Sequence, residues 1–174
     1  MPPRSHHDLK LLHRDLKPQN VFLKEDVSKG GLDASQIKLG DFGISKMLAA
    51  SQGLAQTQCG TPLYMSPEMC RGESYTRAAD VWALGCIMHE LMTLDAPWLR
   101  QMGPHGPCGV DALMRHISNV ELRIDRRALR AHYSSELCAL LMAMVAPVAD
   151  DRPSLRSLMS WPLFQQARAM ADYV

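Results

Sequence analysis

Residues 13–20 read His-Arg-Asp-Leu-Lys-Pro-Gln-Asn, so an acid, a lysine and an amide fall within six residues. A second acid, Asp41, opens an Asp-Phe-Gly triplet further along the chain. Transfer of a phosphoryl group needs a carboxylate for the proton of the attacking hydroxyl, cations on the moving group and metal ions on the polyphosphate. The pattern therefore predicts phosphoryl transfer, with Asp15 as the base and Lys17 as the cation. Asn20 and Asp41 offer hard oxygen ligands suited to Mg2+.

Two short β-prone runs follow this stretch, Val-Phe-Leu at 21–23 and Ile-Lys-Leu at 37–39, and they predict a β-hairpin. The connection between them, residues 24–36, contains two glycines and several charges and is expected to be a long, mobile surface loop. Small polar residues over 44–58 predict another loop. In residues 60–68 two prolines predict turns and exclude regular helix.

The remainder of the chain shows helical spacing of its apolar residues. The strongest prediction covers 76–93, where almost no polar face remains, so this helix should lie at the centre of the core. Shorter helices are predicted over 110–119, 134–145 and 155–159. Three prolines and three glycines in 95–109 predict an irregular loop.

Asp80 is the one acid near the start of the apolar 76–93 segment. A carboxylate in such surroundings is unfavourable unless it accepts hydrogen bonds, which suggests a specific partner. Simple interaction with the helix dipole in the first turn is the alternative. The spacing of the residues alone does not decide between the two.

Composition excludes several classes of protein. The chain has 174 residues, of which 47% are hydrophobic, and this is enough for one globular core. A net charge of +1, with 19 basic residues against 18 acidic ones, predicts no nucleic-acid partner. Five cysteines without C-x-x-C spacing favour reduced thiols over a disulfide framework or a zinc site. No segment is long and apolar enough for a membrane span or a signal peptide, so a cytoplasmic location is expected, with the nucleus as the alternative.

The motifs together resemble those of eukaryotic protein kinases. Residues 13–20 resemble the catalytic loop, 41–43 resemble the magnesium motif, and Ser-Pro-Glu at 66–68 stands where Ala-Pro-Glu is usual. The resemblance covers residues 9–164 and implies a mainly α fold, the C-terminal lobe of a kinase, built as a helical bundle with a small β-hairpin. It also implies transfer of the γ-phosphate of ATP to protein hydroxyl groups, with ATP and Mg2+ as cofactors.

The resemblance is specifically to serine/threonine kinases. Lys17 follows the Asp-Leu pair of the loop, where tyrosine kinases have an alanine-rich sequence, and residues 60–62 resemble the substrate-facing loop of the serine/threonine enzymes. Within that class, residues 20–23, 38–45 and 60–68 are similar to the NIMA-related kinases. The implied partner is a protein substrate with a serine or threonine acceptor.

The resemblance also assigns roles at the nucleotide site. Phe22 is implied to lie under the adenine ring, and ordinary strand packing is an equally compatible role. Lys17, Asn20 and Asp41 are implied to complete the ATP site.

Further roles concern the activation segment, residues 41–68. Thr57 resembles an activating phosphosite, and Arg14 is implied to pair with its phosphate, whereas the alternative treats Thr57 as one polar loop residue among several. Thr61 is implied to hydrogen-bond near Asp15 and Lys17, where it would help define the hydroxyl acceptor.

Five residues are implied to have structural roles. Glu68 and Arg152 resemble an ion pair that joins the end of the activation segment to the late helices; two solvated charges are the alternative. Asp80 is implied to accept hydrogen bonds from the backbone of the catalytic loop. His13 and Phe42 are implied to stack as part of the spine that links the two lobes.

The resemblance divides the chain into a polar lead at 1–8, a partial kinase domain at 9–164 and a tail at 165–174. A complete kinase also needs a glycine-rich loop, a strand lysine and a helix glutamate, and no G-x-G-x-x-G occurs in the sequence. Only twelve residues precede His13, so the N-terminal lobe is expected to be absent. The missing lobe predicts weak ATP binding and no measurable phosphorylation by this fragment alone.

Two consequences of an absent lobe are expected. Apolar surface on the 76–93 helix should be exposed and should favour chaperone binding. A noncatalytic binding module, or a regulatory decoy derived from a kinase lobe, is the alternative function.

Overall fold

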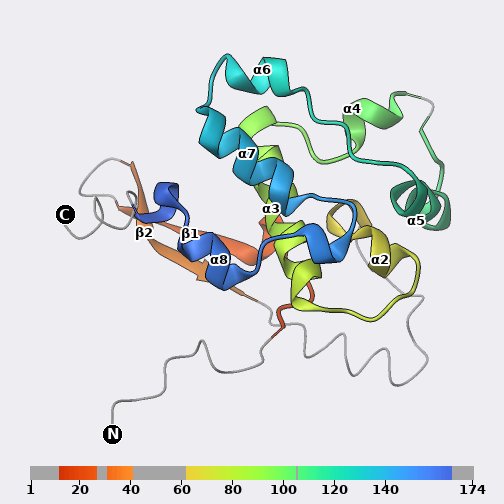
Figure 1. Cartoon of the computed structure of the whole chain (residues 1–174), viewed down its shortest axis with the longest axis horizontal. Coiled ribbons are helices and arrows are strands. Elements are labelled where there is room, and N and C mark those ends of the chain that lie inside the picture. Colours follow the sequence, from red (N-terminus) through yellow and green to blue (C-terminus); the bar gives the residue numbers. More distant parts are fainter. Residues whose placement is uncertain (1–11, 27–30, 41–61, 105, 166–174) are drawn as a thin grey trace, which may run out of the picture.

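The computed structural model describes residues 12–26, 31–40, 62–104 and 106–165 of the chain. Figure 1 shows a mainly helical molecule with one two-stranded sheet, which confirms the prediction of a mainly α fold with a small hairpin. None of the helices in these four ranges has the length and apolar character needed to cross a membrane.

The elements follow one another in a simple order. The first part contains a 3-10 turn and two strands: η2 (Pro18–Asn20), β1 (Val21–Asp26) and β2 (Gly31–Leu39). The middle part contains η3 (Pro62–Tyr64), α2 (Pro67–Cys70), α3 (Arg77–Thr93) and α4 (Leu99–Met102). The last part contains α5 (Val110–Asn119), α6 (Arg126–Arg130), α7 (Ser135–Met144), η4 (Ala149–Asp151) and α8 (Leu155–Met159).

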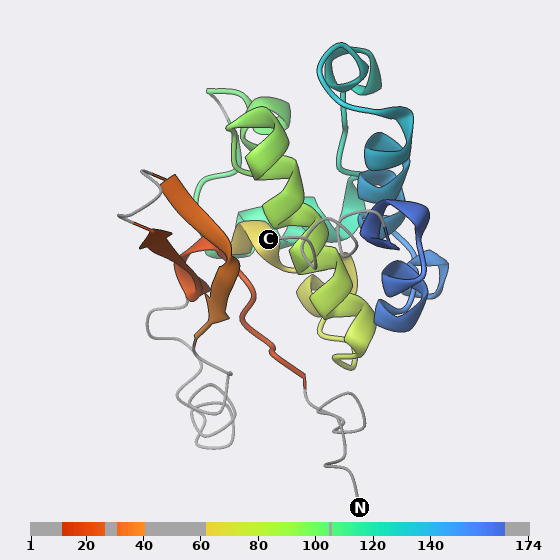
Figure 2. The same ribbon diagram turned by 90° about the vertical axis from the view of Figure 1, so that its left-hand side faces the viewer.

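Helix α3 is the central element, as predicted from its apolar sequence. It begins where Thr76 Oγ1 accepts a hydrogen bond from the amide of Ala78, and it ends at Leu94 in the left-handed conformation. In Figure 2 it lies between the hairpin on one side and α7 and α8 on the other. One stripe of α3 stays exposed, since Leu84 and Leu91 are 38% and 71% accessible.

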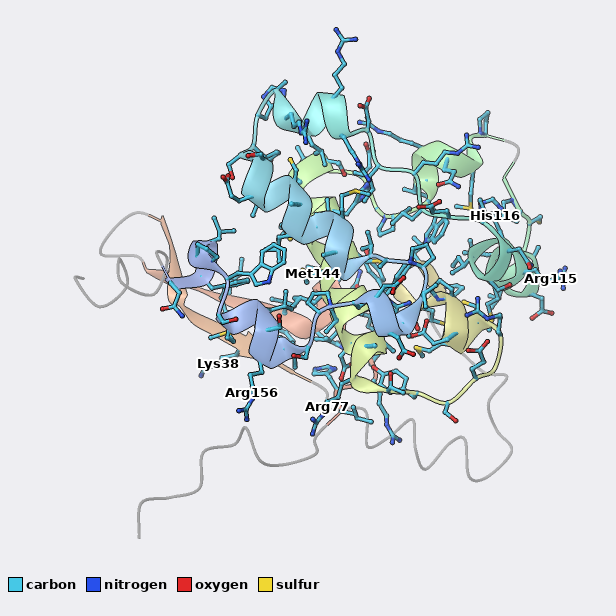
Figure 3. All side chains as sticks on the ribbon, viewed as in Figure 1. Lys38, Arg77, Arg115, His116, Met144 and Arg156 are labelled. Atoms are coloured by element: carbon cyan, nitrogen blue, oxygen red, sulfur yellow. The ribbon has the colours of Figure 1, made fainter. Side chains whose placement is uncertain are left out.

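The core consists of two apolar clusters that share α3 and α7. In the larger cluster, Trp82 of α3 stacks on Trp98, with ring centroids 6.4 Å apart, and both meet Leu141 of α7. The smaller one joins α3 and α7 to α8 and includes Met144, which points into the interior in Figure 3. The lack of a side chain at Gly85 allows α3 to pack closely against the end of α7, because a Cβ there would lie 2.7 Å from Val145 Cγ1.

The hairpin is longer than the sequence predicted. The strands pair antiparallel from Val21 opposite Leu39 to Asp26 opposite Gly31, with an irregularity between Phe22 and Lys24. Most of the expected loop at 24–36 is therefore strand, and that prediction was wrong. Strands pair through their backbone N–H and C=O groups, which does not need apolar side chains. The pairing can therefore continue through polar residues that a search for apolar runs does not recognise as strand.

The predictions for two proline-containing segments also need correction. Pro67 opens the short helix α2, because proline at the first helical position lacks only an amide hydrogen that has no helical partner anyway. The expected irregular loop at 95–109 contains α4, a single helical turn that ends at Gly103. Its sequence, Leu-Arg-Gln-Met, contains neither proline nor glycine, the two residue types from which an irregular loop was predicted.

Candidate active site

The predicted base, cation and amide lie together in the structure. Lys17 Nζ is 3.0 Å from Asp15 Oδ2, and Asn20 Nδ2 donates to the same oxygen at 3.2 Å and to the carbonyl of Asp15 at 2.7 Å. Pro18 starts the 3-10 turn η2, which brings Asn20 back to Asp15. All three residues line a pocket of about 620 Å3.

The chemistry of these side chains fits the predicted cofactor. The amide nitrogen of Asn20 is directed to Asp15, which leaves its amide oxygen as a hard ligand for Mg2+. The second predicted ligand, Asp41, lies outside the described residues. Within the part of the chain that the structure describes, no group of three or more His, Cys, Asp and Glu side chains could hold a metal ion. Two protein ligands are typical of Mg2+, which takes its other ligands from phosphates and water.

Asp80 holds the backbone of the loop. Its Oδ2 accepts the amide of His13 at 3.0 Å, its Oδ1 accepts the amide of Arg14 at 3.1 Å, and the hydroxyl of Tyr75 also donates to Oδ1. We call Asp80 and these three donors the Asp80 clasp. The hydrogen bonds compensate the burial of a carboxylate that is 8% exposed on an apolar helix. They also hold Arg14 at φ 67°, a conformation that residues with a Cβ adopt rarely.

His13 and Asn20 connect the loop to the end of β2. His13 is buried, and its Nε2 donates to the carbonyl of Gly40 at 3.0 Å. The amide of Gly40 donates in turn to the carbonyl of Asn20 at 2.9 Å. Since Asp41 follows Gly40 in the sequence, these bonds fix the backbone immediately before the predicted metal ligand.

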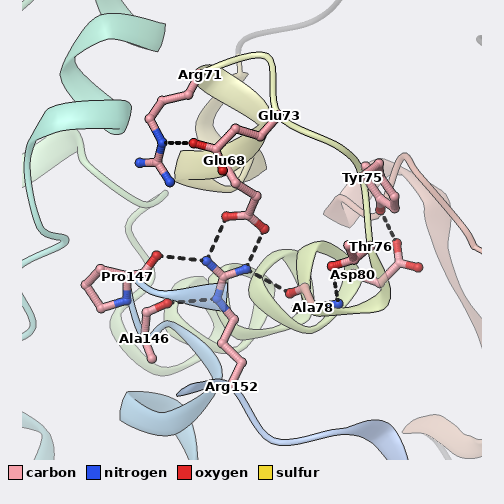
Figure 4. Close-up of polar contacts among 10 residues, drawn as sticks. All are labelled: Glu68, Arg71, Glu73, Tyr75, Thr76, Ala78, Asp80, Ala146, Pro147 and Arg152. Atoms are coloured by element: carbon pink, nitrogen blue, oxygen red, sulfur yellow. Dashed lines mark hydrogen bonds and ion pairs between the residues drawn. The ribbon is translucent and has the colours of Figure 1, made fainter. Parts of the chain in front are cut away.

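Arg152 and Glu68 meet in a buried, bidentate ion pair (Figure 4). Arg152 Nη1 lies 2.7 Å from Glu68 Oε1, and Nη2 lies 2.9 Å from Oε2. The guanidinium also donates to the carbonyls of Ala78, Ala146 and Pro147. Burial alone would raise the pKa of Glu68, but the hydrogen bonds and the charge of Arg152, together with hydrogen bonds from Ser66 and from the backbone of Glu68 itself, outweigh it and hold that pKa below its ordinary value.

The remaining predicted site residues are not joined to this group in the described structure. Phe22 is 57% exposed on β1, and its ring lies against Gly40, where a Cβ would meet it at 2.5 Å. Phe42, Thr57 and Thr61 lie outside the described residues. Their assigned roles, and those of the residues above, stay predictions.

Three ionisable pocket residues were not predicted from the sequence: Tyr64, Tyr75 and Glu90. Tyr64 donates its hydroxyl to Glu90 Oε2 at 2.5 Å, and burial together with this carboxylate raises the pKa of Tyr64. Glu90 is the second acid on the apolar helix α3, so the reasoning applied to Asp80 could have identified it. Nothing local in the sequence marks the two tyrosines.

Comparison with known proteins agrees with this geometry. The protein kinase domain family matches residues 4–164. The chain is 38% identical over 167 residues to serine/threonine-protein kinase Nek5 of Mus musculus, which covers 96% of the chain and 24% of that protein. It is 38% identical over 160 residues to the G2-specific protein kinase nimA of Emericella nidulans, covering 91% of the chain and 20% of nimA.

These relatives are much longer proteins. The chain spans about a quarter of mouse Nek5 and a fifth of nimA. Serine/threonine-protein kinase Nek1 of Mus musculus matches over 156 residues at 36% identity, which is 88% of the chain and 11% of Nek1. The chain therefore belongs to the protein kinase family, and its relatives there are NIMA-related serine/threonine kinases.

Proposed function

We propose that this chain supplies the catalytic loop and the helical lobe of a serine/threonine protein kinase that transfers the γ-phosphate of ATP to protein hydroxyl groups. The observation that supports this best is the group formed by Asp15, Lys17 and Asn20, which faces a 620 Å3 pocket. The Asp80 clasp anchors this group on the central helix α3, and fixed positions are the main contribution that kinases make to their reaction.

Each loop residue has a separate task in this proposal. Asp15 accepts the proton of the substrate hydroxyl as that oxygen attacks the γ-phosphorus. Lys17, held 3.0 Å from Asp15, neutralises charge on the transferred group. Asn20 and Asp41 would hold Mg2+, which neutralises the polyphosphate when it is bound.

The far side of the pocket suits a protein substrate. Besides the loop residues, the lining includes Leu63 and Tyr64 of η3, Met65 directly after it, and Glu90 of α3. An extended peptide could lie along this wall with its serine or threonine at Asp15. Thr61 as an acceptor-defining residue and Thr57 as an activating phosphosite paired with Arg14 are parts of the same proposal.

The chain is also proposed to be a partial kinase domain. Residues 9–164 would form the C-terminal lobe, with the activation segment at 41–68. No G-x-G-x-x-G motif occurs in the 174 residues, so the phosphates lack the backbone amides that would orient them from above. We therefore expect residues 1–174 alone to bind Mg-ATP weakly and to give no measurable phosphorylation of a generic serine/threonine substrate.

The decisive experiment is a phosphotransfer assay on the protein at the full length that its gene encodes. Labelled Mg-ATP and a generic serine/threonine substrate such as casein should give labelled product. Asp15→Asn should reduce kcat by roughly 10²- to 10⁴-fold, because the general base is lost. Asp150→Asn makes the same chemical change at an exposed position of η4 and should leave kcat unchanged.

Two results would contradict the proposal. Wild-type rates in Asp15→Asn would exclude the assigned base. No labelled product from a folded wild-type protein would favour the noncatalytic binding module instead, and the exposed leucines at positions 84, 91 and 94 would then be its first candidate contact surface.

A further inference from the structure

Tyr75 has an unusual position between the central helix and the catalytic loop. It lies just before Thr76, the residue that caps α3, and it is half-buried. Figure 4 shows its hydroxyl directed at Asp80, where it donates to Oδ1. The same oxygen accepts the amide of Arg14 at 3.1 Å, so Tyr75 and the loop share one acceptor atom.

The aromatic ring of Tyr75 makes a second contact with the loop. The guanidinium carbon of Arg14 lies 5.9 Å from the ring centroid, within the range of a cation–π interaction. Arg14 has φ 67° without being glycine, so neighbouring groups must stabilise its backbone. Tyr75 therefore contacts Arg14 directly through its ring and indirectly through Asp80.

We propose that Tyr75 is a positioning residue for the catalytic loop: its hydroxyl orients the Asp80 carboxylate, and its ring supports Arg14 in the left-handed conformation. Asp15 follows Arg14 directly, so a change at Arg14 displaces the predicted base. The inference rests on the proposed function only for its effect on catalysis, since the effect on the loop backbone is independent of any reaction.

The hydroxyl of Tyr75 keeps its proton and so remains a hydrogen-bond donor to Asp80. Its burial and its hydrogen bond to Asp80 raise the pKa of Tyr75, so the group stays protonated at every pH at which the protein would work. The Asp80 clasp therefore does not lose this donor through titration of the tyrosine.

The chain offers a matched control for testing this role. Tyr133 is also half-buried, and its hydroxyl donates to the carbonyl of Met92 at 3.2 Å, at the opposite end of α3 from Asp80. Tyr75→Phe and Tyr133→Phe remove the same atom and one hydrogen bond each. Only the first removes a bond from the Asp80 clasp.

The primary measurement is amide hydrogen exchange on the protein at the full length that its gene encodes. In Tyr75→Phe, the amides of His13 and Arg14 should exchange about five- to tenfold faster, as expected when one hydrogen bond that fixes their acceptor is lost. In Tyr133→Phe these two amides should exchange as in the wild type. Unchanged exchange in Tyr75→Phe, or equal acceleration in both variants, would overturn the inference.

Kinetics provide the second measurement. Tyr75→Phe should reduce kcat several-fold with the KM for ATP nearly unchanged, whereas Tyr133→Phe should leave both constants at the wild-type value. Wild-type kcat in Tyr75→Phe would overturn the positioning role. If the wild-type protein transfers no phosphate, the proposed function fails, and the exchange measurement still decides the role of Tyr75.

A second variant covers the case in which Tyr75→Phe does not fold. Tyr75→Gln removes the ring and keeps a hydrogen-bond donor. The Arg14 amide should exchange faster in this variant, because the ring contact is lost. Wild-type exchange of both the His13 and the Arg14 amides would overturn the positioning role of Tyr75.

Discussion

Around α3, apolar side chains are enclosed by other helices, whereas in the β1–β2 hairpin they face solvent. Trp82 and Leu141 are 1% and 0% exposed, but Phe22 and Ile37 on the hairpin are 57% and 52% exposed. Most of the stabilisation from apolar burial must therefore come from the helical part, residues 62–165. The hairpin is held to the loop mainly through its backbone at Gly40.

The two regions also differ in the burial of charged side chains. The helical part buries Glu68, Asp80 and Arg152, and the side chain of each makes at least two hydrogen bonds. Two of these residues connect segments that are far apart in the sequence: Asp80 reaches the catalytic loop, and Arg152 reaches α2. The catalytic loop is therefore anchored by a buried charge of the helical part, Asp80, whereas the end of the hairpin contributes the backbone bonds at Gly40.

The largest expected difference concerns arginine. Arg152→Ala should lower the free energy of unfolding by about 3–5 kcal/mol, because it leaves the buried Glu68 carboxylate without its partner. Arg100→Ala removes the exposed ion pair with Asp95 and should lower it by less than about 1 kcal/mol. Urea denaturation of both variants measures the difference. Equal midpoints would show that the Arg152–Glu68 pair does not stabilise the helical part.

A smaller difference is expected for leucine. Leu141→Ala in the core should reduce the free energy of unfolding by about 2–5 kcal/mol, since it removes buried contacts and leaves a cavity. Leu39→Ala on β2, where the side chain is 47% exposed, should reduce it by no more than about 0.5 kcal/mol. Thermal unfolding followed by circular dichroism distinguishes them. A large effect of Leu39→Ala would mean that the hairpin face is covered in solution.

Substitutions of two glycines test the same difference in packing between the two regions. Gly85→Ala places a Cβ 2.7 Å from Val145 and 2.9 Å from Met144, inside a packed helix contact, and should destabilise by about 1–3 kcal/mol. Gly40→Ala brings a Cβ within 2.5 Å of the Phe22 ring, but that ring is exposed and can turn away. Its unfolding midpoint in urea should therefore lie nearer to the wild-type value than that of Gly85→Ala. The reverse order would contradict the conclusion that side chains of the hairpin are packed less closely than those around α3.

The smallest effect concerns pH. Burial lowers the pKa of His89 in the folded protein below the ordinary value of 6.5, so the neutral ring is the folded form. As pH falls below 6.5 the unfolded chain takes up a proton first, and stability is lost until the pH passes the folded pKa. Urea midpoints at pH 7.5 and pH 5.5 should thus differ less in His89→Gln than in the wild type. His132→Gln, at an exposed position, is the control and should keep the wild-type difference.

The helices were predicted most accurately where their apolar spacing was strong and a capping residue preceded them. Helix α3 matches its prediction to one residue, because its apolar run and its Thr76 cap agree. Ser134 and Ser154 likewise cap α7 and α8 near the predicted positions. Helices α4 and α6 were missed, although the equally short α8 was predicted, since four or five residues carry little periodicity and give an uncertain prediction.

For the candidate site, the motif residues and the hydrogen bonds from the loop backbone to Asp80 were predicted, whereas the contribution of Tyr75 was not. Asp15, Lys17 and Asn20 lie within one short loop, so their proximity follows from the sequence itself. Tyr75 reaches the loop only through the fold, from a position about sixty residues away along the chain. Sequence spacing cannot reveal such a contact without knowledge of where α3 lies.

The guanidinium of Arg152, besides its ion pair, lies 4.9 Å from the centre of the Trp82 ring. The three tryptophans of the chain, Trp82, Trp98 and Trp161, all belong to the helical part. Tryptophan fluorescence will therefore report on this part alone, and melting of the hairpin will not change it directly. A fluorescence signal from the hairpin needs a dye or an introduced tryptophan. Comparing the two signals would show directly whether β1 and β2 unfold before the helical part does.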